Sequence, residues 1–345
     1  MDDTTLPAAG QPGAPQTTRR GAWPYALAGA LALEAAGLRL AAAAPEAGGA
    51  PAAAGQAPGL PDFPIVDGHV HLWDLRRTAV PWVRGNAVLD RSYGPADLSQ
   101  QAGDVALGAL VYVEVGAAPQ YTLLEADWVV EQAARDGRIQ GLVAYAPVEY
   151  GEVVRPYLDA LISRGPLVKG VRRGWQGGDP RLPISDDFVR GVQILGEYGL
   201  SFDVLARSPE ETASAIRLVE RVPGTRIVLD HLLKPDIKQG ALEPWRTQLR
   251  ELAAFPNVSA KISGLVTEAD QQNWTPADLA PYVEHALTVF GEDRVVFGGD
   301  WPVALQASTY PRWVATLSGL TAGLSPAARR KLFAENARRF YRLPT

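Results

Sequence analysis

The sequence predicts a distorted (β/α)8 barrel of the TIM type, preceded by an N-terminal segment that lies outside the fold. Short apolar runs rich in β-branched residues alternate with longer amphipathic segments from residue 61 onward. This alternation is typical of a parallel sheet covered by helices, and eight strands match a closed barrel. An open doubly wound sheet is the alternative, but no Gly-x-Gly-x-x-Gly turn follows the first strand. The predicted strands are 63–70, 107–115, 139–146, 167–171, 200–205, 226–229, 258–262 and 294–297.

Between these strands, the apolar spacing favours amphipathic helices. Two of them begin with clear start signals, Ser208-Pro209-Glu210-Glu211 and Thr275-Pro276, in which a hydroxyl residue precedes a proline at the first helical position. We therefore expect residues 61–345 to form one barrel domain. The predicted helices are 121–136, 153–164, 186–198, 209–221, 244–255, 276–290 and 326–340.

Residues 1–60 differ from the rest in being rich in Ala, Gly and Pro. Arg19 and Arg20 precede an apolar run at 23–44, and the three alanines at 42–44 fit a small-residue cleavage site. This layout indicates a twin-arginine secretory signal and predicts a periplasmic or extracellular protein.

Two charges, Glu34 and Arg39, interrupt that apolar run. A membrane span needs about 20 residues with few charges, so we expect no stable span. The alternative is a disordered, low-complexity tail on a cytoplasmic protein. In either case the segment, with a linker at 45–60, is outside the fold.

Composition excludes several classes of function. The formal net charge is −5, from 33 basic and 38 acidic residues, without a basic patch, so we expect no nucleic-acid partner. The absence of cysteine excludes thiolate catalysis and cysteine-based zinc sites. The expected partner is a small-molecule substrate, and a homo-oligomer remains open.

The chemistry of a (β/α)8 barrel lies at the carboxyl ends of its strands, and three of the four histidines stand there. His69 and His71 end the first strand and share one of its faces, because side chains alternate along a strand. His231 follows the sixth strand, and Asp300 follows the eighth after two glycines. This convergence predicts the active site, with the imidazoles as metal ligands or as electrophiles for a carbonyl oxygen. His285 falls within a helical pattern and is expected to be an ordinary histidine.

Further polar and aromatic residues stand at other strand ends. Glu114 ends the second strand, and an arginine after the fourth strand could grip a carboxylate with two hydrogen bonds. A lysine inside the seventh strand is unusual, because parallel strands are buried on both faces. Trp73 fits packing as well as substrate contact. The candidates for substrate binding are Glu114, Arg172, Arg173, Lys261, Trp73 and Trp301.

Four segments together resemble the amidohydrolase superfamily: Val-Asp-Gly-His-Val-His-Leu-Trp-Asp (66–74), Asp-His-Leu-Leu-Lys-Pro (230–235), Lys-Ile-Ser-Gly-Leu (261–265) and Phe-Gly-Gly-Asp-Trp-Pro-Val (297–303). More narrowly, they resemble its amidohydrolase-related branch, which includes fuconolactonase-like and pyrone-dicarboxylate lactonases. The resemblance spans residues 61–341. It implies that Asp300 activates the hydrolytic water.

The resemblance also implies that His69, His71, His231 and Asp300 hold one Zn²⁺ or another divalent ion, or that the histidines act without metal. Two departures oppose a two-metal form. No histidine ends the fifth strand at 202–205, and no carbamylated lysine is evident at the end of the fourth, although Lys169 is near.

The expected function is therefore that of a hydrolase, most simply a lactonase that opens a sugar-derived or carboxylated lactone. Its water is activated by Asp300. A metal-dependent decarboxylase of the same superfamily is an alternative, although its relatives usually carry a histidine on strand five. Hydrolysis of another ester or amide would use the same groups. A barrel that binds a sugar acid without turnover is the third alternative.

Overall fold

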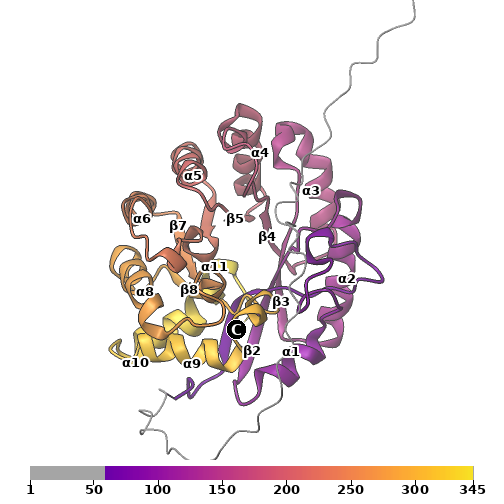
Figure 1. Ribbon diagram of the computed structural model, residues 1–345. Coiled ribbons are helices and arrows are strands. Elements are labelled where there is room, and N and C mark those ends of the chain that lie inside the picture. Colours follow the sequence, from indigo (N-terminus) through magenta and orange to yellow (C-terminus); the bar gives the residue numbers. More distant parts are fainter. Residues whose placement is uncertain (1–58, 345) are drawn as a thin grey trace, which may run out of the picture. The chain divides into compact units, whose positions relative to one another are not determined.

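A computed structural model describes residues 59–344 and confirms the predicted (β/α)8 barrel. Eight parallel strands follow one another in chain order around the sheet, with helices outside them (Figure 1). Each predicted strand coincides with an observed one to within two residues at either end. The strands are β1 (Ile65–Val70), β2 (Leu107–Val113), β3 (Ile139–Ala144), β4 (Val168–Arg172), β5 (Ser201–Val204), β6 (Arg226–Leu229), β7 (Val258–Ile262) and β8 (Val295–Phe297).

All of the predicted helices form, and the predicted start signals are confirmed. The Ser208 hydroxyl accepts a hydrogen bond from the Glu211 amide at 3.1 Å, which satisfies an amide of the first turn. The helix predicted at 326–340 is interrupted by a π-helical turn, η8 (Lys331–Glu335). The helices are α1 (Pro95–Ala102), α2 (Thr122–Arg135), α3 (Arg155–Ile162), α4 (Asp186–Glu197), α5 (Pro209–Arg221), α6 (Trp245–Ala253), α7 (Leu265–Glu268), α8 (Pro276–Phe290), α9 (Tyr310–Leu320), α10 (Pro326–Arg330) and α11 (Asn336–Tyr341).

Short turns complete the loops. Seven of them, in the described residues, are 3-10 helices, and six of these are η1 (Pro81–Val83), η2 (Pro119–Tyr121), η3 (Val148–Val154), η4 (Leu182–Ile184), η6 (Ile237–Gln239) and η7 (Val303–Gln306). The seventh, η5 (Asp230–Leu233), contains positive backbone φ angles and belongs to the functional site.

The barrel closes just beyond the end of β8, where the chain meets β1. The Asp300 amide donates to the His69 carbonyl at 2.8 Å, and the His71 amide donates to the Trp301 carbonyl at 2.7 Å. Glycine permits this approach, because a Cβ on Gly298 would lie 2.7 Å from the Cβ of His69. Closure therefore places both histidines of β1 beside Asp300.

A buried carboxylate joins the same two segments. Asp67 Oδ1 accepts hydrogen bonds from the amides of His69 at 3.0 Å and Gly299 at 2.8 Å. Its Oδ2 accepts from the Tyr310 hydroxyl at 2.7 Å. Burial raises the pKa of Asp67 to about 6, against the opposing effect of these hydrogen bonds.

The C-terminal segment covers the amino ends of the strands, opposite the expected active site (Figure 1). Arg226, the first residue of β6, donates to the Phe340 carbonyl, and Lys169 of β4 donates to the Arg342 carbonyl at 3.1 Å. Tyr341 packs among the valines of the barrel interior and donates its hydroxyl to Asp203 Oδ2 at 2.7 Å. The interior is thus filled by side chains and closed at this end.

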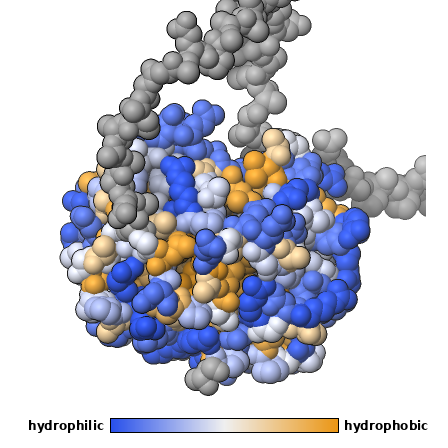
Figure 2. Space-filling view, turned by 90° about the horizontal axis from the view of Figure 1, so that it is seen from below, coloured by the Kyte–Doolittle hydropathy of each residue, from blue (hydrophilic) through white to orange (hydrophobic). Residues whose placement is uncertain are grey.

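The face seen in Figure 2 is mostly hydrophilic, with smaller apolar patches. Within residues 59–344, no helix is long and apolar enough to cross a membrane. The predicted secretory signal and nearly all of the linker lie outside the described residues, so export stays a prediction. Homo-oligomer formation likewise stays a prediction.

Candidate active site

Three imidazoles converge on the Asp300 carboxylate at the carboxyl ends of the strands. The Asp300 Oδ1 atom lies 3.5 Å from His71 Nε2, 3.8 Å from His69 Nε2 and 3.9 Å from His231 Nε2. The Nε2 atoms of His69 and His71 are 3.1 Å apart. Each of the four side chains is at most 5% exposed. The structure therefore brings together all four residues predicted to form the reacting centre.

The backbone holds two of these residues in a sparsely populated conformation. Asp300 has a φ of 50°, and His231 has a φ of 53°. Positive φ continues through residues 232–234, although none of them is glycine. Such conformations cost about 1–3 kcal/mol each and occur preferentially at functional sites. Here they turn both side chains toward the shared point.

The imidazole nitrogens that face away from Asp300 each have a fixed partner. His71 Nδ1 lies 2.8 Å from the Val113 carbonyl oxygen, and His231 Nδ1 lies 2.9 Å from the Ser263 hydroxyl. A carbonyl can only accept, so neutral His71 carries its proton on Nδ1 and a lone pair on Nε2. Such outer contacts orient metal-binding histidines. Ser263 belongs to the segment 261–265, but a serine after a strand carries no specific signal, so its contact with His231 was not predicted.

Burial and the neighbouring imidazoles together set the charges at the centre. Burial lowers the pKa of His69 well below its ordinary value and lowers that of His231 to about 4, so both imidazoles are neutral at pH 7. Burial alone would raise the pKa of Asp300, but His231, His71 and His69 outweigh it and hold that pKa below its ordinary value. The site thus presents neutral imidazoles beside an ionised carboxylate.

This donor set fits a single divalent metal ion. Ligands about 2.0–2.1 Å from a tetrahedral zinc ion are separated by about 3.3 Å. The three Nε2 atoms lie 3.5 to 3.9 Å from Asp300 Oδ1, and those of His69 and His71 are 3.1 Å apart. Gly264 leaves room beside them, since a Cβ there would lie 2.6 Å from His231 Nδ1 and 2.7 Å from Asp300 Oδ2. His69, His71 and Asp300 form one compact group, and His69, Asp230 and His231 form another.

A buried lysine lies against the second of these groups. Lys261 Nζ is 2.6 Å from Asp203 Oδ2, 2.9 Å from Asp230 Oδ1 and 3.1 Å from His69 Nδ1. We call Lys261, Asp203 and Asp230 the charged floor; all three side chains are fully buried. Burial raises the pKa of Asp203 to about 6, against the opposing charge of Lys261. Lys261 therefore supports His69 from the interior of the barrel. It is fully buried and is not open to a substrate in this structure.

The two arginines predicted as substrate contacts are held by carboxylates. Arg172 Nε lies 2.6 Å from Glu114 Oε1, its NH1 atom lies 3.3 Å from Asp230 Oδ2, and the arginine is buried. Arg173 pairs with Glu149 at 2.9 Å. These arginines and Glu114 stand at the mouth as paired charges.

Trp73 and Trp301 are packed in the core, 1% and 0% exposed. Their indole N–H groups donate to the Arg91 carbonyl at 2.6 Å and to Gln101 Oε1 at 2.9 Å. Neither is open to a substrate in this structure; both pack against Tyr93. His285 Nε2 donates to the Arg246 carbonyl at 2.9 Å from within helix α8, as expected of an ordinary histidine.

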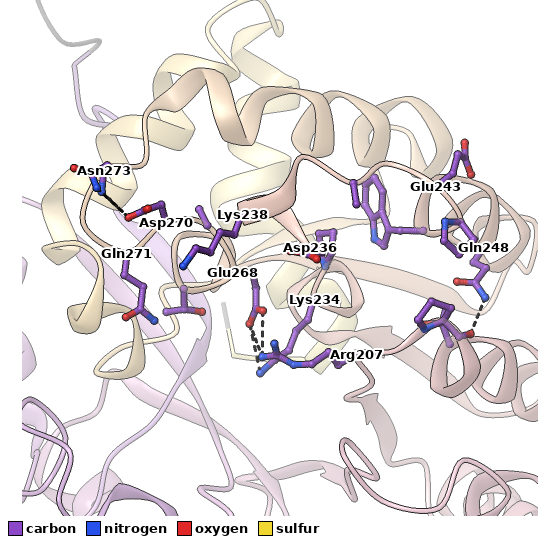
Figure 3. A pocket seen from close by; sticks show the side chains of 18 of the residues that line it. Arg207, Lys234, Asp236, Lys238, Glu243, Gln248, Glu268, Asp270, Gln271 and Asn273 are labelled. Atoms are coloured by element: carbon purple, nitrogen blue, oxygen red, sulfur yellow. Dashed lines mark hydrogen bonds and ion pairs between the residues drawn. The ribbon is translucent and has the colours of Figure 1, made fainter. Parts of the chain in front are cut away.

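A cavity of about 860 Å³ opens beside the mouth, between α5, α6 and the loops after β5, β6 and β7 (Figure 3). Its lining includes Arg207, Lys234 and Glu268, which the sequence analysis did not single out. Glu268 lies 3.1 Å from Arg207 and 3.7 Å from Lys234. Only the fold brings these three loops together, so no local pattern could have indicated the cluster.

Comparison with known proteins places this centre in context. The family model described as "Amidohydrolase" matches residues 66–343. An L-fucono-1,5-lactonase of Burkholderia multivorans is 35% identical over 293 residues, covering 81% of this chain and 96% of that protein. A second L-fucono-1,5-lactonase, from Burkholderia ambifaria, is 30% identical over 287 residues, covering 81% of this chain and 95% of that protein. A crystal structure of an amidohydrolase from B. multivorans with bound zinc is 32% identical, with a TM-score of 0.74, and covers 82% of this chain and 100% of that one.

Proposed function

Since the chain belongs to the amidohydrolase family, we propose that it is a lactonase that opens a sugar-derived cyclic ester with water activated by Asp300. The observation that carries the proposal is the convergence of three Nε2 atoms on the Asp300 carboxylate. The similarity to two L-fucono-1,5-lactonases supports the substrate class.

In the first step, the ionised Asp300 takes a proton from water while the water oxygen bonds to the lactone carbonyl carbon. In the second, the bond from that carbon to the ring oxygen breaks, and Asp300 returns the proton to the departing alkoxide. The product is an open-chain hydroxy acid, which ionises and acidifies the solution. The lowered pKa of Asp300 keeps the carboxyl group ionised at neutral pH, which is the form that can take a proton.

We further propose that His69, His71, His231 and Asp300 hold one divalent metal ion, as the zinc-bound relative suggests. A metal at this place would polarise the carbonyl oxygen and lower the pKa of water. The lone pair on His71 Nε2 supports this form, because neutral His71 cannot donate a hydrogen bond there to an oxyanion.

The decarboxylase alternative has less support from the residues. Such relatives carry a histidine on strand five, and none stands at 202–205, where Asp203 is fully buried and bound to Lys261 at 2.6 Å. Release of carbon dioxide from an aromatic or enol acid would identify this activity, whereas lactone opening releases only a proton.

The test is Asp300→Asn, assayed with a panel of aldonolactones and a pH indicator, with and without a chelator. We expect turnover to fall by about 10²–10⁴-fold, because general base catalysis contributes that much. Asp270→Asn is the matched control, since Asp270 lines the cavity beside the mouth, which no histidine lines. Near wild-type turnover by Asp300→Asn would overturn the assignment. Loss of activity with chelator, restored by zinc, would support the metal.

A further inference from the structure

The cavity beside the mouth contains a charged cluster that leads toward the reacting centre. Lys234 ends the turn that begins at His231, so the two side chains are placed by one backbone segment. Burial lowers the pKa of Lys234, while Glu268 and, at longer range, Asp300 oppose this effect. Lys234 therefore lies within electrostatic reach of Asp300 while it also lines the cavity.

Glu268 is the other half of this cluster. Its side chain is 6% exposed, whereas that of Lys234 is 17% exposed and that of Arg207 is 52% exposed. Figure 3 shows all three pointing toward one another in the lower part of the view. The Glu268 carboxylate thus lies 3.1 Å from Arg207 and 3.7 Å from Lys234. The Lys234 ammonium group, a hydrogen-bond donor, therefore lies beside the Glu268 carboxylate, an acceptor.

Hydroxyl groups suit such a pair, because each hydroxyl donates one hydrogen bond and accepts others. A substrate carboxylate suits it less well, because it would have to share Lys234 and Arg207 with Glu268, whose own charge opposes it. The nearby arginines are already paired: Arg172 with Glu114 and Asp230, and Arg173 with Glu149. A carboxylated lactone would have to compete with these buried carboxylates for its counter-charge.

We infer that Lys234 and Glu268, supported by Arg207, form the subsite that recognises the hydroxyl groups of an uncharged, polyhydroxylated lactone. The inference rests on the proposed lactonase function and deepens it, because it names the residues that recognise the hydroxyl groups of the sugar-derived lactone. Lys234 donates to a ring substituent and Glu268 accepts from one, while the carbonyl is directed at Asp300.

The experiment compares an aldonolactone with δ-valerolactone, which has the same ring without hydroxyl groups, in Lys234→Met and Glu268→Gln. A lost hydrogen bond to a charged group is worth about 1.5–3 kcal/mol, so we expect kcat/KM for the aldonolactone to fall about 10–100-fold further than that for δ-valerolactone. Lys238→Met is the matched control, because Lys238 is an exposed lysine of the same cavity. It should not change the ratio of the two values.

Equal falls of kcat/KM for both lactones, in variants with a wild-type thermal midpoint, would overturn the subsite. Lys234→Gln provides a second variant if Lys234→Met does not fold. Wild-type preference for a carboxylated lactone over its uncharged analogue would also overturn it. Wild-type protein that opens neither lactone would instead refute the proposed function, so the two failures are distinguishable.

Discussion

Replacing Lys261 by Met tests whether the charged floor holds the site together. Methionine has a similar length but no charge, so the substitution keeps the volume and removes the cation. Asp203 then retains only the Tyr341 hydroxyl at 2.7 Å, whereas Asp230 retains Arg172 at 3.3 Å. Breaking a buried ion pair by removing one partner costs about 3–5 kcal/mol. That is a large share of the roughly 5–15 kcal/mol by which a domain is stable.

The loss should depend on pH in a definite direction. Burial already raises the pKa of Asp203 to about 6 with Lys261 in place. A carboxyl whose folded-state pKa is raised contributes stability that is present below its unfolded value and is lost as pH rises through the folded one. Without Lys261 the folded pKa rises further. Asp230 loses its Lys261 partner at both pH values, whereas the ionised form of Asp203 is opposed only at the higher one, so the deficit of the variant should be larger above pH 7 than near pH 5.

The measurement is guanidinium unfolding of the wild type and of Lys261→Met at pH 5 and pH 8, with Lys261→Met/Asp203→Asn as the matched rescue. The double variant should recover much of the loss at pH 8, because no ionised carboxylate then remains at position 203. A loss below about 1 kcal/mol at pH 8, or an equal loss at both pH values, would refute the reasoning.

Two further predictions concern the closure of the barrel and the space beside the histidines. The free energy of unfolding of Asp67→Asn should lie within about 1 kcal/mol of the wild-type value at pH 7.5. The amide oxygen still accepts from His69 and Gly299, and the amide nitrogen can donate to the Tyr310 hydroxyl. Asp67→Ala should lower the free energy of unfolding by about 3 kcal/mol or more, because these donors stay buried without an acceptor. Equal losses for Asp67→Ala and Asp67→Asn in urea unfolding would contradict this. Gly264→Ala should lower kcat about 100-fold, because the new Cβ would lie 2.6 Å from His231 Nδ1 and 2.7 Å from Asp300 Oδ2 and would displace both side chains, at a backbone φ of +63° that alanine rarely adopts. Steady-state kinetics with zinc titration calorimetry would check it, and unchanged kcat and zinc affinity would count against the geometry.

The sequence alone was enough for the barrel and for the convergence of the four candidate residues, because both follow from local patterns. Alternation of apolar runs and helical spacing predicts the strands, and the carboxyl ends of strands predict where His69, His71, His231 and Asp300 lie. The short helices α1 and α7 and the helix α9 were not predicted. The structure shows that the predicted last helix is divided by a π turn.

Partners across the fold could not be predicted in the same way. Lys261 and His69 are 192 residues apart, so no local pattern reveals that the lysine lies under the histidine. The indoles of Trp73 and Trp301 fit a pocket or a core equally well, and only the position of Tyr93 decides for the core. Lys234 and Glu268 belong to loops that become neighbours only when the strands are in order.

The contact of Tyr341 with Asp203 has a consequence for the synthesis of the chain. The two residues are 138 positions apart, and the tyrosine completes the hydrogen bonds beneath Lys261. While a ribosome is still translating the barrel, Asp203 and Lys261 have therefore emerged without their final hydroxyl donor and without the covering of α11. The hydrogen bonds beneath Lys261 are complete only after residue 341 has left the exit tunnel, so this part of the candidate active site takes its final form after translation of the barrel rather than strand by strand during it.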